Sequence, residues 1–344
     1  MKIIYDDIIY SLQRGGGISL YWSQLETYLN QDIHLLYSGY EKNIFLPEFK
    51  GKKIIKNNML LFERYKNVRS FEKEPFIFHS SYYRYCKNTN VVNITTVHDF
   101  TYEFFRRDVK STMHKIQKKA AVENSKAIIC NSENTKKDFL FFYPNYEGLV
   151  KVIYLGFSND YCHLNITRKH NVIFIGGREG YKNFEYAVKV VHELPNLNLQ
   201  IIGGGELKKQ EIALLEKYVP NRYEYYRSLS NKELNIKYNE AKFLLYPSLY
   251  EGFGVPVVEA QATGCPVVCC GVSSLPEVAG EAAIYISGKD IENDLRIISG
   301  LEDRDYYCCI VEKGFNNCKR FSWKKCAEQT QEFYQKIWDK QGFL

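Results

Sequence analysis

The segment YEGFGVPVVE, residues 250–259, decides the fold and the chemistry that we expect of this 344-residue chain. The apolar run Phe243–Tyr246 precedes the segment and is typical of a buried strand. A helix is predicted from Val255, because Pro256 is tolerated in a first helical turn. Gly264 is a typical helix end. The pattern therefore predicts a strand, a glycine-bearing turn and a helix in succession.

The turn before this helix is a predicted binding site. Glycines ahead of a helix N-terminus expose amide N–H groups at the positive end of the helix dipole, which suits a phosphate or a polar sugar. Glu251 lies in the turn, and Glu259 lies about one helical turn further on, with its side chain leaning back. Since carboxylates repel phosphate, we expect both to accept hydrogen bonds from sugar hydroxyls. The alternative is one surface glutamate and one glutamate that stabilises the helix dipole.

The segment resembles the retaining GT-B glycosyltransferases of family 4, whose signature is two glutamates separated by seven residues. The resemblance implies that Glu251 acts at the donor sugar. It also implies that the backbone of Gly252, Phe253 and Gly254 holds this sugar, and that Glu259 binds the ribose hydroxyls of the nucleotide.

The composition is that of an ordinary globular protein, with 45% hydrophobic and 25% charged residues. No apolar run approaches the ~20 residues that span a bilayer, and early acidic residues argue against a signal peptide. The ten cysteines form no CxxC pair, and we expect reduced, buried thiols at Cys269-Cys270 and Cys308-Cys309. The histidines show no zinc-binding spacing, so no metal is expected. We therefore expect a cytoplasmic protein.

The net charge of +6 is uneven, because the excess of positive charge lies in residues 1–156. Two interpretations are equally favoured: an anionic partner, such as membrane headgroups or a lipid-linked acceptor, or a solvated lysine-rich surface. Nucleic acid is not expected, since no nucleic-acid-binding motif accompanies the charge. The residues concerned form two groups: Lys50, Lys52, Lys53, Lys56, Arg64, Lys66 and Arg69, and Arg106, Arg107, Lys110, Lys115, Lys118 and Lys119.

Apolar runs alternate with helical patterns in both halves of the chain, which predicts parallel sheets covered by helices. The pattern breaks around Leu155–Asn171, where we expect a linker. The predicted fold class is α/β, with two Rossmann-like domains and a ligand site in the cleft between them. We assign residues 1–156 to an acceptor-binding domain and 171–320 to a nucleotide-sugar-binding domain. The GT-B resemblance implies that the last helix, in 321–344, crosses back onto the first domain.

Two further loops resemble donor-binding elements of the same family. Gly16 and Gly17 precede a predicted helix, and the resemblance implies that this loop meets the donor diphosphate; a flexible turn is the alternative. Arg178 and Lys182 follow a predicted strand, Val172–Ile175, and could bracket a diphosphate and stabilise the leaving group. An exposed basic turn is the alternative there.

Polar residues also follow two predicted strands of the first half. His98 and Asp99 follow Val92–Val97, and the resemblance implies that the histidine lies near the transferred sugar. A lone histidine is otherwise more often structural. Asn131 and Ser132 resemble another family segment, although Ser132 is equally suited to capping the next helix.

We thus expect a metal-independent, retaining hexosyltransferase that uses no cofactor besides its sugar-nucleotide substrate. GDP-mannose is the first expected donor and a UDP-hexose the second. The acceptor is expected to be a glycan or lipid-linked saccharide, as in cell-surface polysaccharide synthesis at the inner face of the membrane. The alternatives are a GT-B epimerase or phosphorylase and a non-catalytic sugar-nucleotide-binding subunit. The motif Asp303-Arg304-Asp305 is expected to begin a helix and not to bind a metal.

Overall fold

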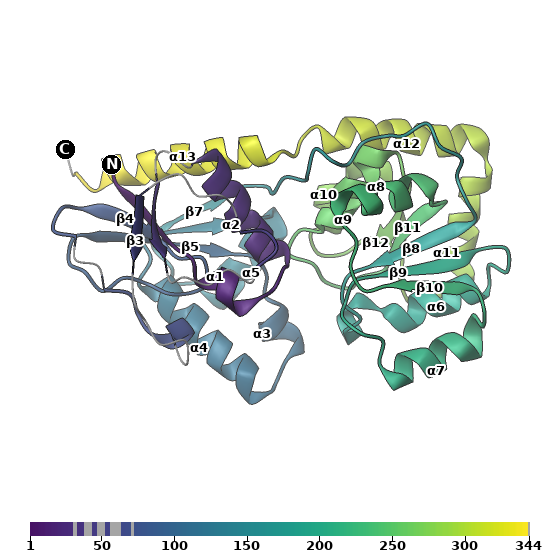
Figure 1. The fold of residues 1–344 in the computed structure, drawn as a ribbon, viewed down its shortest axis with the longest axis horizontal. Helices are drawn as coiled ribbons and strands as arrows, with labels where there is room; N and C mark the ends of the chain where they lie inside the picture. The colour runs from purple at the N-terminus through teal and green to yellow at the C-terminus, as the bar shows by residue number, and fades with distance from the viewer. Residues whose placement is uncertain (30–32, 38–42, 47–51, 56–62, 70–71, 343–344) are drawn as a thin grey trace. The chain divides into compact units, whose positions relative to one another are not determined.

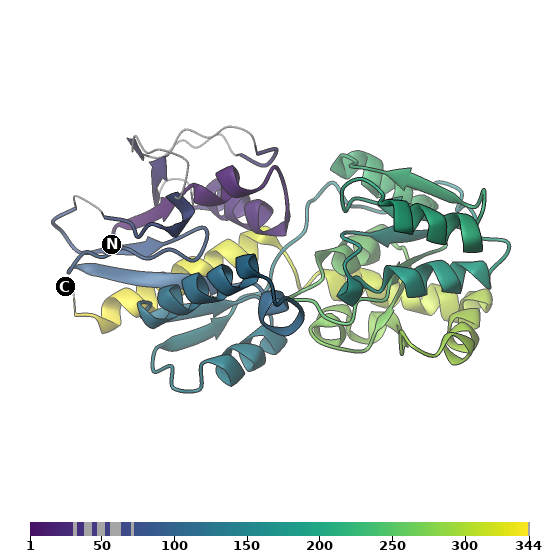
Figure 2. The same cartoon turned by 90° about the horizontal axis from the view of Figure 1, so that it is seen from below.

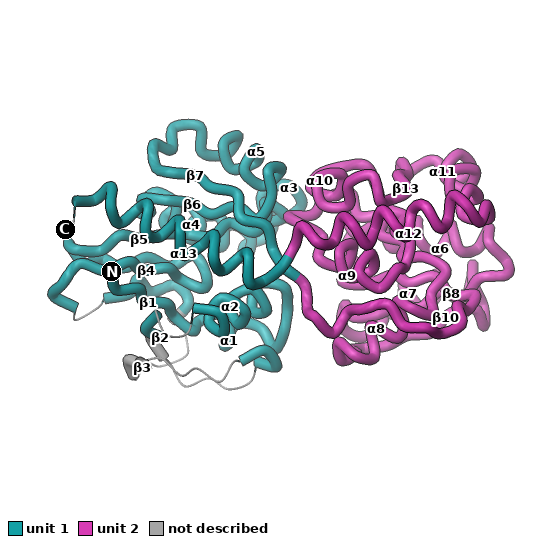
Figure 3. The backbone as a smooth tube through the Cα atoms, turned by 90° about the horizontal axis from the view of Figure 1, so that it is seen from above, with its two compact units in different colours: residues 1–156, 322–344 teal, residues 157–321 magenta. Residues whose placement is uncertain are grey.

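The structure, a computed structural model, describes residues 1–29, 33–37, 43–46, 52–55, 63–69 and 72–342. The chain divides into two compact units, which are coloured separately in Figure 3. Unit 1 comprises residues 1–156 and 322–344, and unit 2 comprises residues 157–321. Unit 2 is therefore an insertion into the chain of unit 1. Of the residues in the predicted basic groups, Lys50 and Lys56 lie outside the described residues.

Within its described residues, unit 1 has a seven-stranded parallel sheet with the order β3-β2-β1-β4-β5-β6-β7. The order reverses between β1 and β4, and ligands of such sheets bind beyond the carboxyl ends of the strands near this reversal. The strands are β1 (Ile3–Asp6), β2 (Ile33–Tyr37), β3 (Lys52–Ile55), β4 (Phe76–His79), β5 (Val91–Val97), β6 (Ala127–Cys130) and β7 (Leu149–Val152).

Helices cover both faces of this sheet, with α2 and α13 on one side and α4 on the other (Figures 1 and 2). The hydroxyl of Tyr334 in α13 forms hydrogen bonds with side chains of the sheet. It lies 2.7 Å from the Tyr5 hydroxyl and 2.5 Å from His79 Nδ1, and all three side chains are buried. The predicted return of the last helix to the first domain is confirmed. The helices are α1 (Ile8–Leu12), α2 (Gly17–Tyr28), η1 (Glu63–Tyr65), α3 (Thr101–Phe105), α4 (Val109–Glu123), α5 (Glu133–Phe142) and α13 (Trp323–Lys340).

Unit 2 has a six-stranded parallel sheet with the order β10-β9-β8-β11-β12-β13, which reverses between β8 and β11. Its core is built from the apolar faces of these strands and of α6. The strands are β8 (Asn171–Ile175), β9 (Asn198–Ile202), β10 (Tyr223–Tyr226), β11 (Phe243–Tyr246), β12 (Val267–Cys270) and β13 (Ala283–Ile286). The helices are η2 (Gly180–Lys182), α6 (Phe184–His192), α7 (Lys209–Tyr218), α8 (Asn231–Glu240), α9 (Val255–Thr263), α10 (Leu275–Ala279), η3 (Gly280–Ala282), α11 (Ile291–Ile298), η4 (Ser299–Glu302) and α12 (Arg304–Cys318).

Several predictions about single residues can be compared with these elements. Asp303 begins α12 as predicted, because its side chain accepts a hydrogen bond from the Tyr306 amide at 2.8 Å. All ten cysteines are free thiols, but the prediction that Cys308 and Cys309 are buried is wrong. Both lie on the exposed side of α12. Apolar neighbours in the sequence therefore did not show which side of the helix is buried. No helix in the described part of the chain is long and apolar enough to cross a bilayer.

Candidate active site

The predicted donor-binding residues of unit 2 follow the two strands at which the strand order reverses. Arg178 and Lys182 follow β8, and Glu251 follows β11, which pairs with β8 in parallel. Because parallel strands end at the same edge of a sheet, the two loops emerge side by side. The fold therefore brings these predicted residues to the edge where a ligand is expected.

Lys182 and Glu251 form a direct ion pair between the two loops. The Lys182 ammonium lies 2.6 Å from Glu251 Oε1, and the two side chains are 14% and 11% exposed. The Lys182 ammonium also lies over the rings of Tyr181 and Tyr246, at 5.4 and 5.7 Å from their centroids. The pair thus sits in a largely aromatic enclosure, where charge interactions are stronger than in water.

Two serines that follow β12 fix the turn that carries Glu251. Ser273 Oγ donates to the Glu251 carbonyl at 2.6 Å, and Ser274 Oγ lies 3.0 Å from the carbonyls of Glu251 and Phe253. Gly254, which begins α9, has a φ of +98°, a conformation that disfavours any side chain. Sequence reasoning did not single out these two serines as supports of the Glu251 turn, because their contacts with it form only in the folded chain.

Glu259 lies in α9 as predicted, and tyrosines surround its carboxylate. The Tyr238 hydroxyl donates to Glu259 Oε2 at 3.1 Å, and Tyr161 provides a second hydrogen bond. Burial raises the pKa of the Glu259 carboxyl to about 7, although the tyrosine hydrogen bonds act in the opposite direction. This carboxyl therefore changes charge near neutral pH.

Arg178 does not join Lys182 and Glu251. Its side chain is only 2% exposed, and Nε donates to Glu211 at 3.0 Å. The remaining guanidinium nitrogens donate to the carbonyls of the turn after β9, at Gly203, Gly204, Gly205 and Glu206. In this structure Arg178 organises a glycine-rich turn, and its predicted contact with a diphosphate stays a prediction.

In unit 1, His98 and Asp99 line a cavity of about 320 Å³ at the carboxyl end of β5. Burial lowers the pKa of His98 to about 4, so its imidazole is neutral at neutral pH. The other lining residues, which sequence reasoning did not single out as a site, are Leu12, Gln13, Ile18, Arg64, Tyr82, Tyr83, Tyr102 and His114. The cavity walls are therefore rich in aromatic rings that could pack against a sugar.

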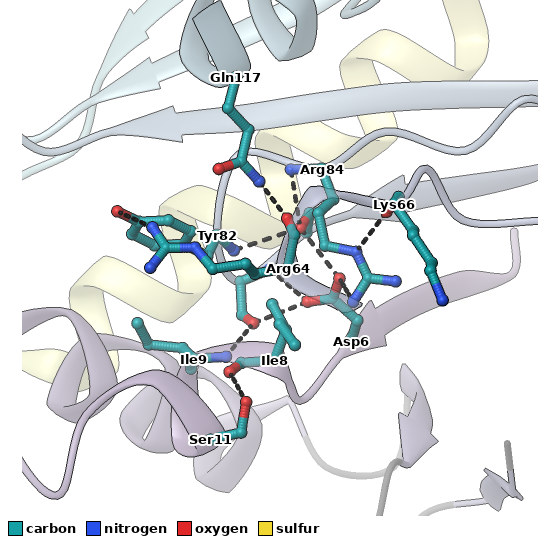
Figure 4. Close-up of polar contacts among 11 residues, drawn as sticks. Asp6, Ile8, Ile9, Ser11, Arg64, Lys66, Tyr82, Arg84 and Gln117 are labelled. Atoms are coloured by element: carbon teal, nitrogen blue, oxygen red, sulfur yellow. Dashed lines mark hydrogen bonds and ion pairs between the residues drawn. The ribbon is translucent and has the colours of Figure 1, made fainter. Parts of the chain in front are cut away.

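A buried polar network supports this cavity at the carboxyl ends of β1 and β4, and Figure 4 shows its contacts. Asp6 accepts hydrogen bonds from Ser81 at 2.7 Å and from Ser80 at 3.0 Å, and lies 3.5 Å from the Arg84 guanidinium. The Tyr82 hydroxyl lies 3.4 Å from an Arg64 guanidinium nitrogen. The acid at the end of β1 thus fixes the loop that presents Tyr82 to the cavity.

The remaining predicted residues of unit 1 occupy helix termini. Gly16 caps α2, and a Cβ at Gly17 would meet no atom of the described residues within 4 Å. Ser132 caps α5 by accepting from the Thr135 amide at 2.9 Å, as the capping alternative predicts. Asn131 is buried, and its side-chain oxygen has no hydrogen-bond partner in the part of the chain that the structure describes. Within the described ranges, no three His, Cys, Asp or Glu side chains gather as a possible metal site.

Sequence comparison relates part of this chain to a known protein family. Residues 163–314 match the family model described as glycosyl transferases group 1. The chain is 27% identical over 267 residues to the O-antigen chain mannosyltransferase B of Escherichia coli. The aligned region covers 70% of this chain and 69% of that protein.

The fold has solved counterparts over nearly its whole length. Sucrose-phosphate synthase from Thermosynechococcus elongatus superimposes with a TM-score of 0.78 at 17% identity, covering 99% of this chain and 100% of that one. The Anabaena protein Alr3699/HepE, solved in complex with UDP-glucose, gives a TM-score of 0.72 at 15% identity, covering 98% and 100%. Both likenesses include the strands and helices of units 1 and 2.

Proposed function

We propose that this chain, which has the GT-B fold, is a member of the glycosyl transferases group 1 family and transfers a hexose from a sugar nucleotide to a saccharide acceptor with retention of configuration. The observation that carries the proposal is the ion pair between Lys182 and Glu251 at the edge where β8 and β11 end. The cation is suited to the diphosphate of a sugar nucleotide, and the carboxylate is suited to accept hydrogen bonds from its hydroxyls.

In the proposed reaction, the bound donor breaks the ion pair between Lys182 and Glu251 and forms its own contacts with both side chains. The diphosphate takes the Lys182 ammonium, while the sugar hydroxyls donate to the Glu251 carboxylate. The bond between the anomeric carbon and the diphosphate oxygen breaks, and the acceptor oxygen bonds to the same face of that carbon. The acceptor proton passes to the leaving diphosphate. Lys182 and the N-terminus of α9 stabilise the leaving charge, so no metal is required.

Residues elsewhere support the two ends of the donor. Glu259, at about one turn into α9, is suited to accept hydrogen bonds from the ribose when it is ionised. Neutral His98 borders the aromatic cavity of unit 1, where we place the acceptor. The ten free thiols favour a reducing compartment, which agrees with a cytoplasmic location.

GDP-mannose is the proposed donor, because the similarity to the E. coli mannosyltransferase extends over most of both chains. A UDP-hexose is the second candidate, since a protein of the same fold holds UDP-glucose. The proposed acceptor is a glycan or a lipid-linked saccharide of cell-surface polysaccharide synthesis. Thermal denaturation with a panel of sugar nucleotides would identify the donor, since a ligand at about 100 times its Kd stabilises by about 2.7 kcal/mol.

The variant Lys182→Met tests the role of the pair. Loss of this cation should lower kcat for transfer by about 100-fold or more, as removal of one preorganised charge-stabilising group does in other enzymes. Lys189→Met is the matched control, because Lys189 pairs with Glu185 on the surface of α6. Equal kcat values for wild type and Lys182→Met would refute the assignment. Donor binding without turnover on any acceptor would instead favour a binding subunit.

A further inference from the structure

The outer surface of α3, α4 and α5 exposes more large apolar side chains than a solvated surface requires. Phe104, Phe105 and Phe141 are 43%, 46% and 73% exposed, and Val109 and Ile116 are 80% and 58% exposed. We name this surface the apolar face; it comprises Phe104, Phe105, Val109, Met113, Ile116, Leu140 and Phe141. Contiguous exposure of this kind typically marks a binding surface.

The pattern along α4 shows that this exposure is ordered. Val109, Met113 and Ile116 recur at helical spacing and form one stripe. The buried residues of α4 form the opposite stripe: Ser111, His114, Lys118, Ala121 and Val122. With 3.6 residues per turn, the apolar stripe points directly away from the domain. A helix that faced only water would place charged residues there.

Aromatic rings connect the exposed apolar residues of α3 with those of α5. The Phe104 ring lies 6.2 Å from that of Phe105 and 5.2 Å from that of Phe142, measured between centroids. The Phe142 ring in turn lies 5.1 Å from that of Phe141. These contacts connect the apolar side chains of α3 with those of α5. The apolar stripe of α4 lies on the helix that packs against α3 and that covers one side of the sheet (Figure 1).

Basic residues surround the apolar stripe. Arg107 and Lys110 are exposed where α4 begins, and Lys119 is exposed near its end, while Lys137 is exposed on α5. The sequence wrongly places Lys118 in a basic surface group. Its side chain is wholly buried and pairs with Glu103 at 2.9 Å. The acids nearby are engaged: Asp108 caps α4 and Glu123 lies 3.7 Å from Lys119.

We propose that the apolar face and its basic rim dock unit 1 on the surface of an anionic lipid bilayer. The apolar side chains would enter the boundary between headgroups and acyl chains, and the basic side chains would contact the anionic headgroups, as in interfacial amphipathic helices. The charge favours an anionic lipid surface, because basic side chains that flank an apolar helical face complement its headgroups. The proposal adds a docking surface to the proposed transferase and does not depend on which sugar is transferred.

Vesicle flotation with the full chain tests the proposal. Wild type should float with phosphatidylcholine vesicles that contain phosphatidylglycerol, and less in high salt, since the basic rim is screened. The double variant Met113→Gln, Ile116→Gln should weaken partition by about tenfold, because two half-exposed side chains lose their burial. The matched control is Ile212→Gln, Ile236→Gln, which alters two similarly exposed isoleucines on α7 and α8.

A fluorescence measurement gives an independent readout that does not require loss of binding. In the variant Val109→Trp the new indole should shift to shorter wavelength on adding anionic vesicles, whereas Ile212→Trp should not respond. The inference is overturned if wild type does not float with anionic vesicles at low salt, or if the apolar double variant floats as well as wild type. It is also overturned if that variant only changes the oligomeric state in gel filtration, since the face would then bind protein.

Discussion

Lys118 offers a sharp test of how the interior of unit 1 is held together. The side chain is fully buried, and its ammonium lies 2.9 Å from Glu103 and donates to the Asp99 carbonyl at 2.8 Å. It also lies 4.2 Å from the centroid of the Phe100 ring. Burial lowers the pKa of Lys118, while the charge of Glu103 raises it, so the ion pair is what keeps a cation in this position.

The variant Lys118→Met retains the aliphatic stem but removes the charge, which leaves Glu103 with a buried, uncompensated carboxylate. Breaking a buried pair from one side typically costs about 3–5 kcal/mol. Adding Glu103→Gln removes the stranded charge, so the double variant should recover much of this loss. The two single changes and the double change thus form a complete thermodynamic cycle.

Tryptophan fluorescence during chemical unfolding is the suitable assay, because all three tryptophans, Trp22, Trp323 and Trp338, belong to unit 1. The signal therefore reports the unfolding of this unit and not of unit 2. Lys119→Met is a matched control on the same helix, since Lys119 is exposed. The reasoning fails if Lys118→Met costs less than about 1 kcal/mol, or if the double variant loses the sum of both single losses.

Two further predictions concern unit 2 and the last helix. The raised pKa of Glu259 should make unit 2 lose up to about 3 kcal/mol as pH rises from about 4.5 to about 7, where the buried carboxyl ionises. Glu259→Gln should abolish this loss in unfolding followed by circular dichroism, and an unchanged pH profile would contradict it. Tyr334→Phe should cost about 1–3 kcal/mol in unit 1, because the hydroxyl of Tyr5 and the ring of His79 lose a buried partner. Tyr28→Phe, at an exposed tyrosine, should cost almost nothing, and equal losses in tryptophan-monitored unfolding would refute the argument.

The order of strands and helices could be predicted because burial in a parallel sheet leaves apolar runs of strand length. Phe243–Tyr246 is such a run, and its predicted limits coincide with β11. The strand Lys52–Ile55 was not predicted, since it lies at the edge of its sheet and begins with two lysines. An edge strand needs fewer apolar residues, so its pattern is weaker.

Individual charged residues were harder to predict, because their partners come from distant segments. Lys118 looks like part of a basic surface in the sequence, yet Glu103 and Asp99 hold it inside. Arg178 looks like an exposed phosphate ligand, yet its guanidinium donates to the Glu211 carboxylate and to carbonyls of the turn after β9. The sequence did not predict the ion pair between Lys182 and Glu251, because the two residues lie on separate loops.

The division of unit 1 into two stretches of chain has a consequence for how the protein is made. Synthesis releases β1 and α2 first, but Tyr334 of α13, which completes the core around Tyr5 and His79, emerges only after the whole of unit 2. Unit 2 is continuous in the chain and can fold as soon as its own residues have left the ribosome. The early segments of unit 1 therefore keep an apolar surface uncovered until unit 2 and α13 have been synthesised, and a chaperone would be of most use during this interval.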